Sequence, residues 1–578
     1  MASSLSQNLF DQVSAAVVEL GTNASTYIPD NVAELASTLT SDVRLASSVV
    51  VLVGVATWTV FSSLRRRHSP PGPPQLPIIG NVHQVPTQMP WIKFTEWSKQ
   101  YGPIFSLNLL GQQVIVLNTH KAAGDLFDRR SNIYSDRPRL IMAGEILTGG
   151  IFMVFARYSD VWRKMRRASH ESFNPRAVEK YLPIQAEAAA HSISRILAQP
   201  ESWEENLKRY TASAILSSVY GWPTFGSEGG IIKRLHAHTA RIASAVVPGA
   251  FLVDFFPFMK YFPTWIAKWK RDGLAWHKAE TDMFEGFNAG VAEKLSAGEA
   301  QHSFVTELID TEERHGLSKK EAAWLAAIMV SAGAETTSTT MFNFMLAMTL
   351  YPDVMRRAQA EIDAVVGRER VPTFDDKENL PFIRVMVRET LRWRPVGPLA
   401  VPRQATEDDW YEGYFIPKGM VSIYNALLDN SDREYLVKTQ SNQSPLNGSI
   451  LIWINFCRDP TIFPDFDVYR PDRFLDESGK NEISPPDTHQ MGHVTYGFGR
   501  RSCVGLHFAN HALFIAIATI LWAADILPPV DENGNVVLPD ANDCVDAGVV
   551  VGPAPFRCRI KPRFPEAQAI LEAHLASL

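Results

Sequence analysis

The chain has 578 residues, a formal net charge of −6 and a hydrophobic share of 46%. The length exceeds that of most single domains, and the hydrophobic share is that of a globular protein with a large core. The acidic balance, with no basic stripe interleaved with aromatic residues, excludes the usual charge pattern of nucleic-acid-binding proteins. The four cysteines show no paired metal spacing and no disulfide framework, which suits a reducing compartment.

The N-terminal region predicts a membrane anchor. Residues 1–45 are polar to mildly amphipathic and predict no fold, whereas residues 46–64 are mostly apolar and carry no formal charge. About 20 such residues span a hydrocarbon core of ~30 Å, so we expect a transmembrane helix at residues 46–64 rather than a buried core helix. An arginine triplet at residues 65–67 places that end in the cytosol by the positive-inside rule. Asn23, in an Asn-Ala-Ser triplet, is then a candidate lumenal glycosylation site.

A stiff spacer separates the anchor from the rest of the chain. Residues 65–80 join the arginine triplet to the run Ser-Pro-Pro-Gly-Pro-Pro, which forms neither a helix nor a central strand. We interpret residues 65–80 as a hinge and residues 81–578 as the main folded domain. That part begins with a predicted hairpin at residues 104–109 and 113–117.

A basic helical stretch follows at residues 162–167. Trp162 and Arg166 are four residues apart there and share one helix face. Taken alone, this pattern is typical of a solvated basic face.

Residues 250–265 combine many aromatic side chains with two prolines. The stretch suits a hydrophobic loop at a membrane interface or at a substrate entrance. Ordinary core packing explains it equally well.

The longest predicted helix begins at Ser318 and ends near Tyr351, before Pro352. Ser318 and Glu321 form a capping box, which marks the start of the helix. A proline just beyond the end of the pattern marks its stop.

This long helix crosses the run Ala-Gly-Ala-Glu-Thr-Thr at residues 332–337. Gly333 in mid-helix costs roughly 1 kcal/mol relative to alanine, which indicates the close approach of something large to the backbone. Glu335 and Thr336 add a carboxylate and a hydroxyl to the same turn, and threonine can bond a carbonyl of its own helix and bend it. A helix with a polar patch is the alternative interpretation.

A further helix is predicted from about Phe382 to Arg394. It carries Glu389 and Arg392, which are three residues apart and can pair on one face. As a surface ion pair they would contribute little to stability.

Cys503 lies in the run Tyr-Gly-Phe-Gly-Arg-Arg-Ser-Cys-Val-Gly at residues 496–505, after which a helical pattern starts. Three glycines in ten residues suit a tight loop with positive φ angles. A thiolate just before a helix is stabilised by the unpaired N–H groups and the dipole there. Such a sulfur is a good ligand for iron, and Arg501 beside it can meet an anionic haem propionate. The alternative is a glycine-rich turn with an incidental cysteine.

The run at residues 496–505 resembles the haem-binding signature of the cytochrome P-450 family, Phe-x-x-Gly-x-Arg-x-Cys-x-Gly. Gly499, Arg501 and Cys503 match it, and Tyr496 departs from it where the family has phenylalanine. A buried tyrosine hydroxyl needs a hydrogen-bond partner, so Tyr496 can alter the surroundings of the sulfur. The proline-rich hinge, the acid–alcohol helix and the charged motifs follow in the family's order.

The resemblance implies a set of cofactor contacts. Cys503 would be the axial ligand of the iron of haem b, and Arg166, Trp162 and Arg403 would contact the haem propionates. The long helix would cross the distal face of the haem at Gly333.

It also implies catalytic and structural roles. Glu335 and Thr336 would organise proton delivery to iron-bound oxygen. Glu389 and Arg392 would form a buried charge network, completed by Arg473 in the downstream run Pro-Asp-Arg-Phe. A charge left without its partner in such a network is costly.

The fold and activity that follow from the resemblance are a mainly α cytochrome P-450 fold with a smaller β-rich part, preceded by a single transmembrane helix. The protein would be a haem-thiolate monooxygenase of the endoplasmic reticulum membrane, with its catalytic domain in the cytosol. It would insert one oxygen atom from O2 into a hydrophobic organic substrate. The motifs resemble those of fungal microsomal members, which implies secondary metabolism or the oxidation of aromatic xenobiotics.

Electrons would come from NADPH through a separate NADPH–cytochrome P-450 reductase, with cytochrome b5 as a further partner, because no P-loop or Rossmann glycine pattern is evident in this sequence.

A haem-thiolate isomerase or dehydratase, or a non-catalytic haem-binding sensor, would use the same cysteine without outside electrons. The pair Glu335 and Thr336 argues against both alternatives. NADPH-dependent oxygen consumption with added reductase separates the three.

One segment departs from the family's pattern. The strand that follows Pro-Lys-Gly is expected to run directly into an Asn-x-Trp stretch, but residues 426–451 intervene with a polar sequence of little periodicity. We interpret residues 426–451 as an insertion, either an exposed loop specific to one lineage or a segment kept from an unspliced transcript.

Overall fold

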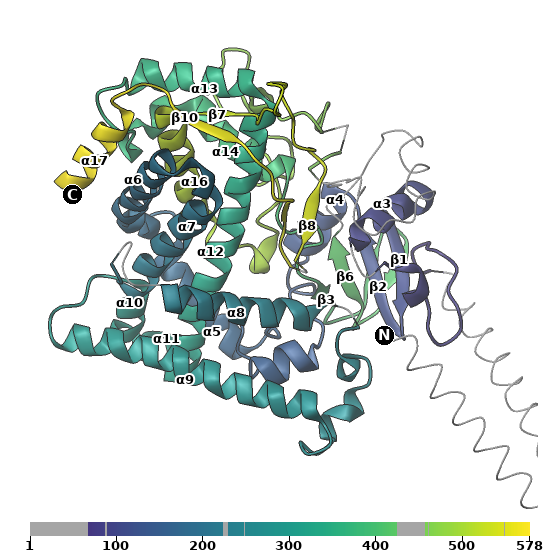
Figure 1. The fold of residues 1–578 in the computed structure, drawn as a ribbon. Coiled ribbons are helices and arrows are strands. Elements are labelled where there is room, and N and C mark those ends of the chain that lie inside the picture. Colours follow the sequence, from purple (N-terminus) through teal and green to yellow (C-terminus); the bar gives the residue numbers. More distant parts are fainter. Residues whose placement is uncertain are drawn as a thin grey trace, which may run out of the picture. The chain divides into compact units, whose positions relative to one another are not determined.

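A computed structural model describes residues 68–86, 89–223, 229–247, 249–424, 457–459, 462–547 and 549–578. The chain divides into two units, Met1–Ser69 and Pro70–Leu578. The predicted N-terminal segment, transmembrane helix and arginine triplet lie outside the described residues, as does the segment 426–451. The second unit is mainly helical with a smaller strand-rich part, as predicted (Figure 1).

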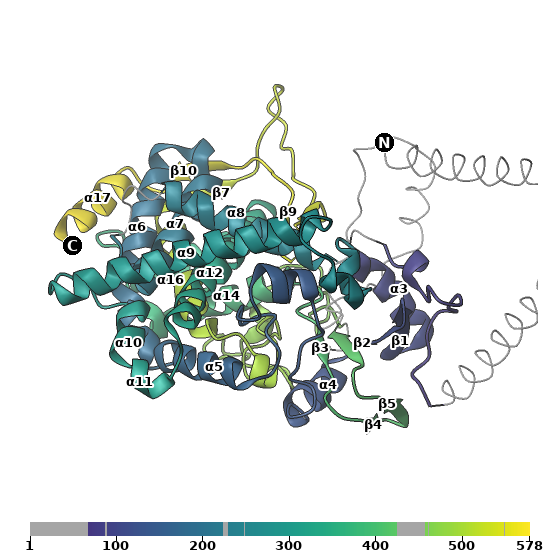
Figure 2. The same cartoon turned by 90° about the horizontal axis from the view of Figure 1, so that it is seen from below.

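The strand-rich part is built on a four-stranded sheet with the order β1-β2-β6-β3. Strands β1 (Ile104–Leu109) and β2 (Gln112–Leu117) form the predicted antiparallel hairpin, and the second strand begins one residue earlier than expected. Leu110 and Gly111 between them have φ angles of 51° and 91°, the left-handed geometry of a two-residue hairpin turn. The sheet is completed by β6 (Val421–Tyr424) and β3 (Arg403–Gln404), and helix α3 (Pro90–Tyr101) lies beside it (Figure 2).

The helical part is arranged around α12 (Lys319–Leu350), which runs through its middle (Figure 1). Helices α7 (Trp203–Tyr220), α9 (Lys268–Ser296), α14 (Pro381–Trp393) and α16 (Leu506–Ala523) pack against it. The capping box at its start is present: the Ser318 backbone N–H donates to Glu321 Oε2 over 2.7 Å, and the Ser318 hydroxyl accepts from the Glu321 N–H. The predicted long helix is therefore confirmed.

Among the described residues, one helix, α16, is long and apolar enough to cross a membrane, but 72% of that span is buried inside the protein. It packs against several other helices, so it is a core element of the folded domain. The further helices are α4 (His120–Ala123), α5 (Asp160–Phe173), α6 (Leu182–Ala198), α8 (Gly229–Val246), α10 (Phe304–Asp310), α11 (Glu312–His315), α13 (Pro352–Val365) and α17 (Ala567–Ser577).

Three small antiparallel pairs complete the strands. They are β4 (Asp409–Tyr411) with β5 (Tyr414–Ile416), β7 (Ala524–Leu527) with β10 (Arg559–Pro562), and β8 (Cys544–Asp546) with β9 (Val551–Pro553). Strand β9 also contacts α12, which brings the C-terminal strands to the central helix.

The aromatic stretch at residues 250–265 lies on the surface. It forms the short helices η6 (Leu252–Asp254) and η7 (Pro257–Tyr261) between α8 and α9. Phe258 is 61% exposed and Trp265 is 78% exposed. Core packing, one of the two interpretations of this stretch, is therefore wrong for most of its large side chains.

Candidate active site

The cysteine loop (residues 496–505) is closed by a backbone hydrogen bond from the Cys503 N–H to the Tyr496 carbonyl, 2.8 Å long. Gly499 within it has a φ of 52°, and a Cβ at this position would lie 2.1 Å from the Phe127 carbonyl oxygen. Only glycine fits there, since both the φ angle and the close backbone exclude a side chain. Gly499 therefore allows the cysteine loop to pack closely against the backbone at Phe127.

Cys503 is an exposed residue, whereas Cys457 and Cys544 are buried. Desolvation by the surrounding protein nevertheless raises the pKa of the Cys503 thiol, and it outweighs the opposing effects of the Gly505 backbone N–H and the Arg166 charge. The expected stabilisation of the thiolate by the helix start is thus present but is smaller than the cost of burial. Coordination of a metal ion would supply the remainder, because it deprotonates a thiol outright.

Arg166 reaches the loop from helix α5. Its Nη1 donates to the Ser502 carbonyl over 2.6 Å. Burial lowers the pKa of this guanidinium, and the nearby Cys503 opposes that change. The helical stretch at residues 162–167 is therefore directed at the cysteine loop, and Arg166 does not belong to a solvated face.

Arg501 lies at the centre of the charged part of the site. Its guanidinium stacks on the Trp162 ring, 4.0 Å from the ring centroid, and its Nε donates to the Ser135 carbonyl over 2.8 Å. Burial lowers the pKa of Arg501 to about 9, with repulsion from Arg403 and Arg166 as further causes. Arg403 and Arg166 are therefore close enough to Arg501 to disfavour its charge.

The other two predicted haem contacts are also near the loop. Arg403 Nη2 donates to the Phe498 carbonyl over 2.6 Å. The Trp162 indole N–H donates to the Met153 carbonyl over 3.1 Å, so the ring face beneath Arg501 is the main contribution of this side chain. Trp162 thus positions Arg501.

The residues present fit an iron porphyrin. Cys503 offers a soft sulfur ligand for iron, and Arg166, Arg403 and Arg501 offer buried positive charge for the two carboxylates of the porphyrin. In the part of the chain that the structure describes, no group of three or more His, Cys, Asp or Glu side chains is placed to hold a metal ion.

Most of helix α12 is buried, but around residues 332–336 it has an accessible patch, where Ala332 is exposed and Gly333, Glu335 and Thr336 are partly exposed. The Thr336 hydroxyl donates to the Ala332 carbonyl over 2.7 Å, the intrahelical bond expected from the sequence. Burial raises the pKa of Glu335, and the charges of His236 and Lys208 oppose this. A carboxyl group of raised pKa next to a hydroxyl is suited to proton transfer near neutral pH.

Gly333 has a packing role that the sequence did not identify. A Cβ at this position would lie 3.1 Å from Ile215 Cγ1. The large group that approaches this helix backbone is therefore helix α7, and a cofactor contact at Gly333 stays a prediction.

The structure brings Glu389, Arg392 and Arg473 together. Arg392 Nε lies 2.6 Å from Glu389 Oε2, and Arg473 Nε lies 3.2 Å from Glu389 Oε1. The first two side chains have no exposed surface, so they do not form the surface ion pair of the alternative interpretation.

Two further residues join the site without a sequence signal. Arg137 donates through Nη1 to the Val401 and Pro402 carbonyls, directly before Arg403. The Tyr496 hydroxyl donates a hydrogen bond to Asn510 Oδ1 over 3.0 Å, so this phenol has the partner that the sequence led us to expect.

Comparison with known proteins identifies the family. A sequence model of the family described as Cytochrome P450 matches residues 70–435 and 448–537. Cytochrome P450 monooxygenase 58 of Postia placenta is 52% identical over 503 residues, which is 87% of this chain and 90% of that protein. Cytochrome P450 monooxygenase ARMGADRAFT_1018420 of Armillaria gallica is 45% identical over 527 residues, 91% of this chain and 96% of that protein. Cytochrome P450 monooxygenase iboC of Amanita muscaria is 38% identical over 547 residues, 91% of this chain and 97% of that protein.

The cysteine loop with its guanidinium cluster, the family match and these fungal relatives lead to the same conclusion: the chain belongs to the cytochrome P450 family and is a cytochrome P450 monooxygenase.

Proposed function

We propose that this chain oxidises a hydrophobic organic substrate in fungal secondary metabolism or xenobiotic oxidation, with Cys503 as the axial ligand of haem iron. The observation that carries the proposal is Cys503, an exposed residue in a glycine-containing loop whose thiol feels the Arg166 charge and whose backbone is contacted by Arg166 and Arg403. Haem held by a cysteine thiolate supplies the centre that activates oxygen.

Residues of the chain would bind the haem and transfer protons. Arg166, Arg403 and Arg501 would bind the carboxylates of the haem. Thr336 and Glu335 hold and pass protons at the accessible patch of α12, where the hydroxyl is oriented by the Ala332 carbonyl. The raised pKa of Glu335 supports this role, because the carboxyl can carry a proton nearer neutral pH than an exposed one.

The hydrophobic class of substrate is supported by the apolar side chains of this part of the fold. Ala334 belongs to an extensive apolar cluster, and Val401, near Arg403, and Val504, next to Cys503, pack against the same cluster. Ligand sites lined mainly by apolar side chains favour hydrophobic ligands.

We further propose that residues 46–64 anchor the protein in the endoplasmic reticulum membrane with the catalytic domain in the cytosol, where a separate flavoprotein reductase delivers electrons from NADPH. The arginine triplet at residues 65–67 supports this orientation. The exposed aromatic stretch at residues 250–265 suits a second contact with the membrane interface. Protease added to intact microsomes should digest the catalytic domain, and protection of that domain would reverse the topology.

The ligand assignment is tested by spectroscopy. Reduced protein with carbon monoxide should show the red-shifted Soret band of thiolate ligation, and Cys503→Ala should lose it. Cys558→Ala is the matched control, because Cys558 lies outside the loop in a strand-forming C-terminal region and is only partly exposed. Retention of the shifted band in Cys503→Ala would refute the assignment.

The reaction class needs a second measurement. Oxygen consumption that depends on NADPH and added reductase, with a product that contains one atom from labelled O2, is expected for a monooxygenase. Turnover without reductase would instead support an isomerase or dehydratase.

A further inference from the structure

Residues 138–153 form a segment, here called the arch, whose two ends lie at the site described above. Before its first residue, Arg137 donates through Nη1 to the Val401 carbonyl over 2.6 Å. At its other end, the Met153 carbonyl accepts a hydrogen bond from Arg501 Nη1 over 3.2 Å. Because Arg501 is expected to contact the haem, the arch borders the space that the cofactor would fill.

The middle of the arch is the short helix η3 (Ile141–Leu147), which contacts α9 and the aromatic stretch at residues 250–265. Its packing on α9 is close: a Cβ at Gly273 would lie 2.8 Å from Ile146 Cγ2 and 2.9 Å from Met142 Cε. A position without room for one methyl group has no room for a ligand. A bulky molecule can therefore pass between η3 and α9 only if the arch moves.

Asp254, in η6 of the aromatic stretch, holds the start of η3. Its Oδ1 accepts hydrogen bonds from the Ile141 N–H over 2.6 Å and from the Met142 N–H over 3.1 Å. Burial raises the pKa of this carboxyl, and the two N–H groups oppose the change. Hydrogen bonds to a carboxylate that is partly removed from water are among the stronger ones in proteins. Asp254 thus fastens the arch to the exposed aromatic stretch.

Two other contacts hold the same short helix. Glu145 pairs with Lys260 of η7, but both side chains are partly exposed, so this pair contributes little. The Leu147 carbonyl lies 3.0 Å from His277 Nδ1 of α9. His277 Nε2 lies 2.8 Å from Lys320 Nζ, which can only donate, so the ring proton is on Nδ1 and is donated to Leu147. The end of η3 is therefore fixed to α9, and its start depends mainly on Asp254.

We propose that Asp254 is a positioning residue for substrate entry: it holds the arch closed, and bulky hydrophobic molecules that arrive at the aromatic stretch reach the haem only when its contact with η3 opens. This inference rests on the proposed function, because it places haem beside the arch. The exposed Phe258 and Trp265 offer apolar surface for the first contact with such molecules.

Azole binding tests the proposal, because an azole nitrogen binds ferric haem and shifts its Soret band whatever the natural substrate is. Stopped-flow rates are compared for clotrimazole, a bulky triaryl azole, and for 1-methylimidazole, which is small. Asp254→Ala should raise both the association and the dissociation rate of clotrimazole by about tenfold or more, the shift in the open population that loss of a charge-assisted hydrogen bond allows. The rates of 1-methylimidazole should stay unchanged, and Asp254→Asn, which keeps an acceptor oxygen, should remain nearer the wild type.

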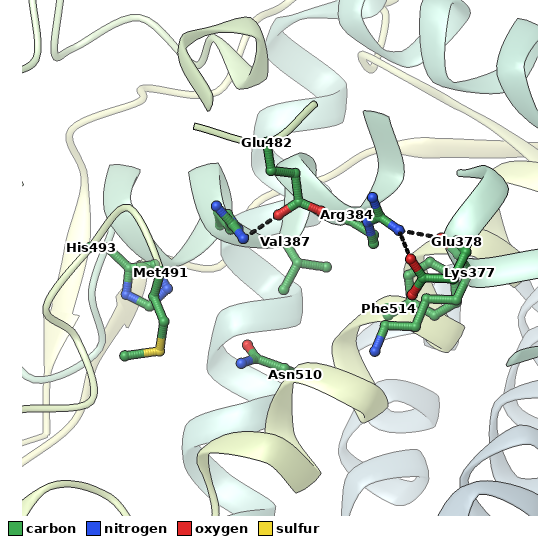
Figure 3. Close-up of a pocket in the computed structure, with 10 residues that line it drawn as sticks. Lys377, Glu378, Arg384, Val387, Glu482, Met491, His493, Asn510 and Phe514 are labelled. Carbon is green, nitrogen blue, oxygen red and sulfur yellow. Dashed lines mark hydrogen bonds and ion pairs between the residues drawn. The ribbon is translucent and has the colours of Figure 1, made fainter. Parts of the chain in front are cut away.

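Glu361→Ala is the matched control. The Glu361 carboxylate accepts from the Phe382 and Ile383 N–H groups over 3.0 and 3.2 Å, the same kind of contact at the start of α14. Glu482→Ala is a second control: this carboxylate pairs with Arg384 of α14 over 2.5 Å and lines a polar pocket of about 330 Å³ (Figure 3). Both controls should lower thermal stability and leave the rates of both azoles unchanged.

Hydrogen exchange of the full chain gives a readout that needs no bound azole. The Ile141 and Met142 amides should exchange faster in Asp254→Ala than in the wild type. Unchanged clotrimazole rates in Asp254→Ala, an equal rise for both azoles, or the same rise in Glu361→Ala would each overturn the proposal. The carbon monoxide spectrum of each variant is recorded first: absence of the red-shifted band in the wild type contradicts the proposed function, and hydrogen exchange then still decides whether Asp254 holds the arch.

Discussion

The buried charge network offers the sharpest test of how this fold is held together. Replacing Arg392 by methionine keeps most of the side-chain volume but removes two of the contacts of the Glu389 carboxylate, at 2.6 and 2.8 Å. Two contacts remain, from Arg473 Nε at 3.2 Å and from the Arg470 backbone N–H at 2.8 Å. Breaking a buried ion pair costs roughly 3–5 kcal/mol, and the surviving partners place this variant near 3 kcal/mol.

The loss extends beyond the ion pair. Arg392 also donates to the Cys457 carbonyl over 2.6 Å and to the Phe466 carbonyl over 2.9 Å. Each of these hydrogen bonds contributes about 1 kcal/mol, so the full destabilisation is expected at about 5 kcal/mol.

The assay is urea unfolding followed by circular dichroism, with haem content measured on the same samples. Arg356→Met is the matched control, because Arg356 pairs with Asp353 at the same three-residue spacing but on the surface of α13. It should change the free energy of unfolding by no more than about 1 kcal/mol. If Arg392→Met costs no more than Arg356→Met, the network does not stabilise the fold and the reasoning fails.

Three further predictions follow from the site and its surroundings. Thr336→Ala should still bind haem and accept electrons but release more peroxide per product, and an unchanged ratio of product to NADPH consumed would remove the proton-delivery role. The pKa of His493 is about 3 in the folded chain against 6.5 for a free imidazole, so the unfolded chain binds more protons below pH 6.5. Its contribution to stability should therefore fall as the pH drops from 6.5 towards 3, by up to about 1.4 kcal/mol per pH unit, and His493→Asn should flatten that slope in urea titrations. Deletion of residues 426–451 should preserve or improve haem incorporation and thermal stability, because the polar sequence there is expected to be an insertion; the family model leaves residues 436–447 of it unmatched but matches residues 426–435 and 448–451. Loss of haem in the deletion variant would make the segment an integral part of the fold.

Local signals predicted the elements that depend on local physics. The hairpin at β1 and β2 follows from alternating side chains around a glycine-containing turn, and the start of α12 follows from the Ser318 capping box. The pairing of Glu389 with Arg392 follows from their spacing on one helix. In each case the interacting residues are close together in the sequence, so the local sequence pattern is enough to predict their contact.

Contacts between distant segments could not be predicted in this way. Gly333 was expected to admit a large group, but only the packed structure shows that Ile215 of another helix is that group. Tyr496 was expected to need a partner, and the partner is Asn510, on the helix beyond the loop.

The guanidinium cluster connects cofactor binding with the stability of the fold. Burial and the neighbouring guanidiniums lower the pKa of Arg501 to about 9. The charged form of Arg501 is therefore destabilised in the folded chain. A ligand that brings two carboxylates to these charges binds the folded chain and has no comparable site in the unfolded chain. Such a ligand stabilises the fold in proportion to the logarithm of its concentration over its dissociation constant. Haem is thus expected to stabilise the native state through the same side chains that orient it. Substitution of Arg501 should therefore lower the thermal stability of the loaded enzyme more than that of the haem-free chain.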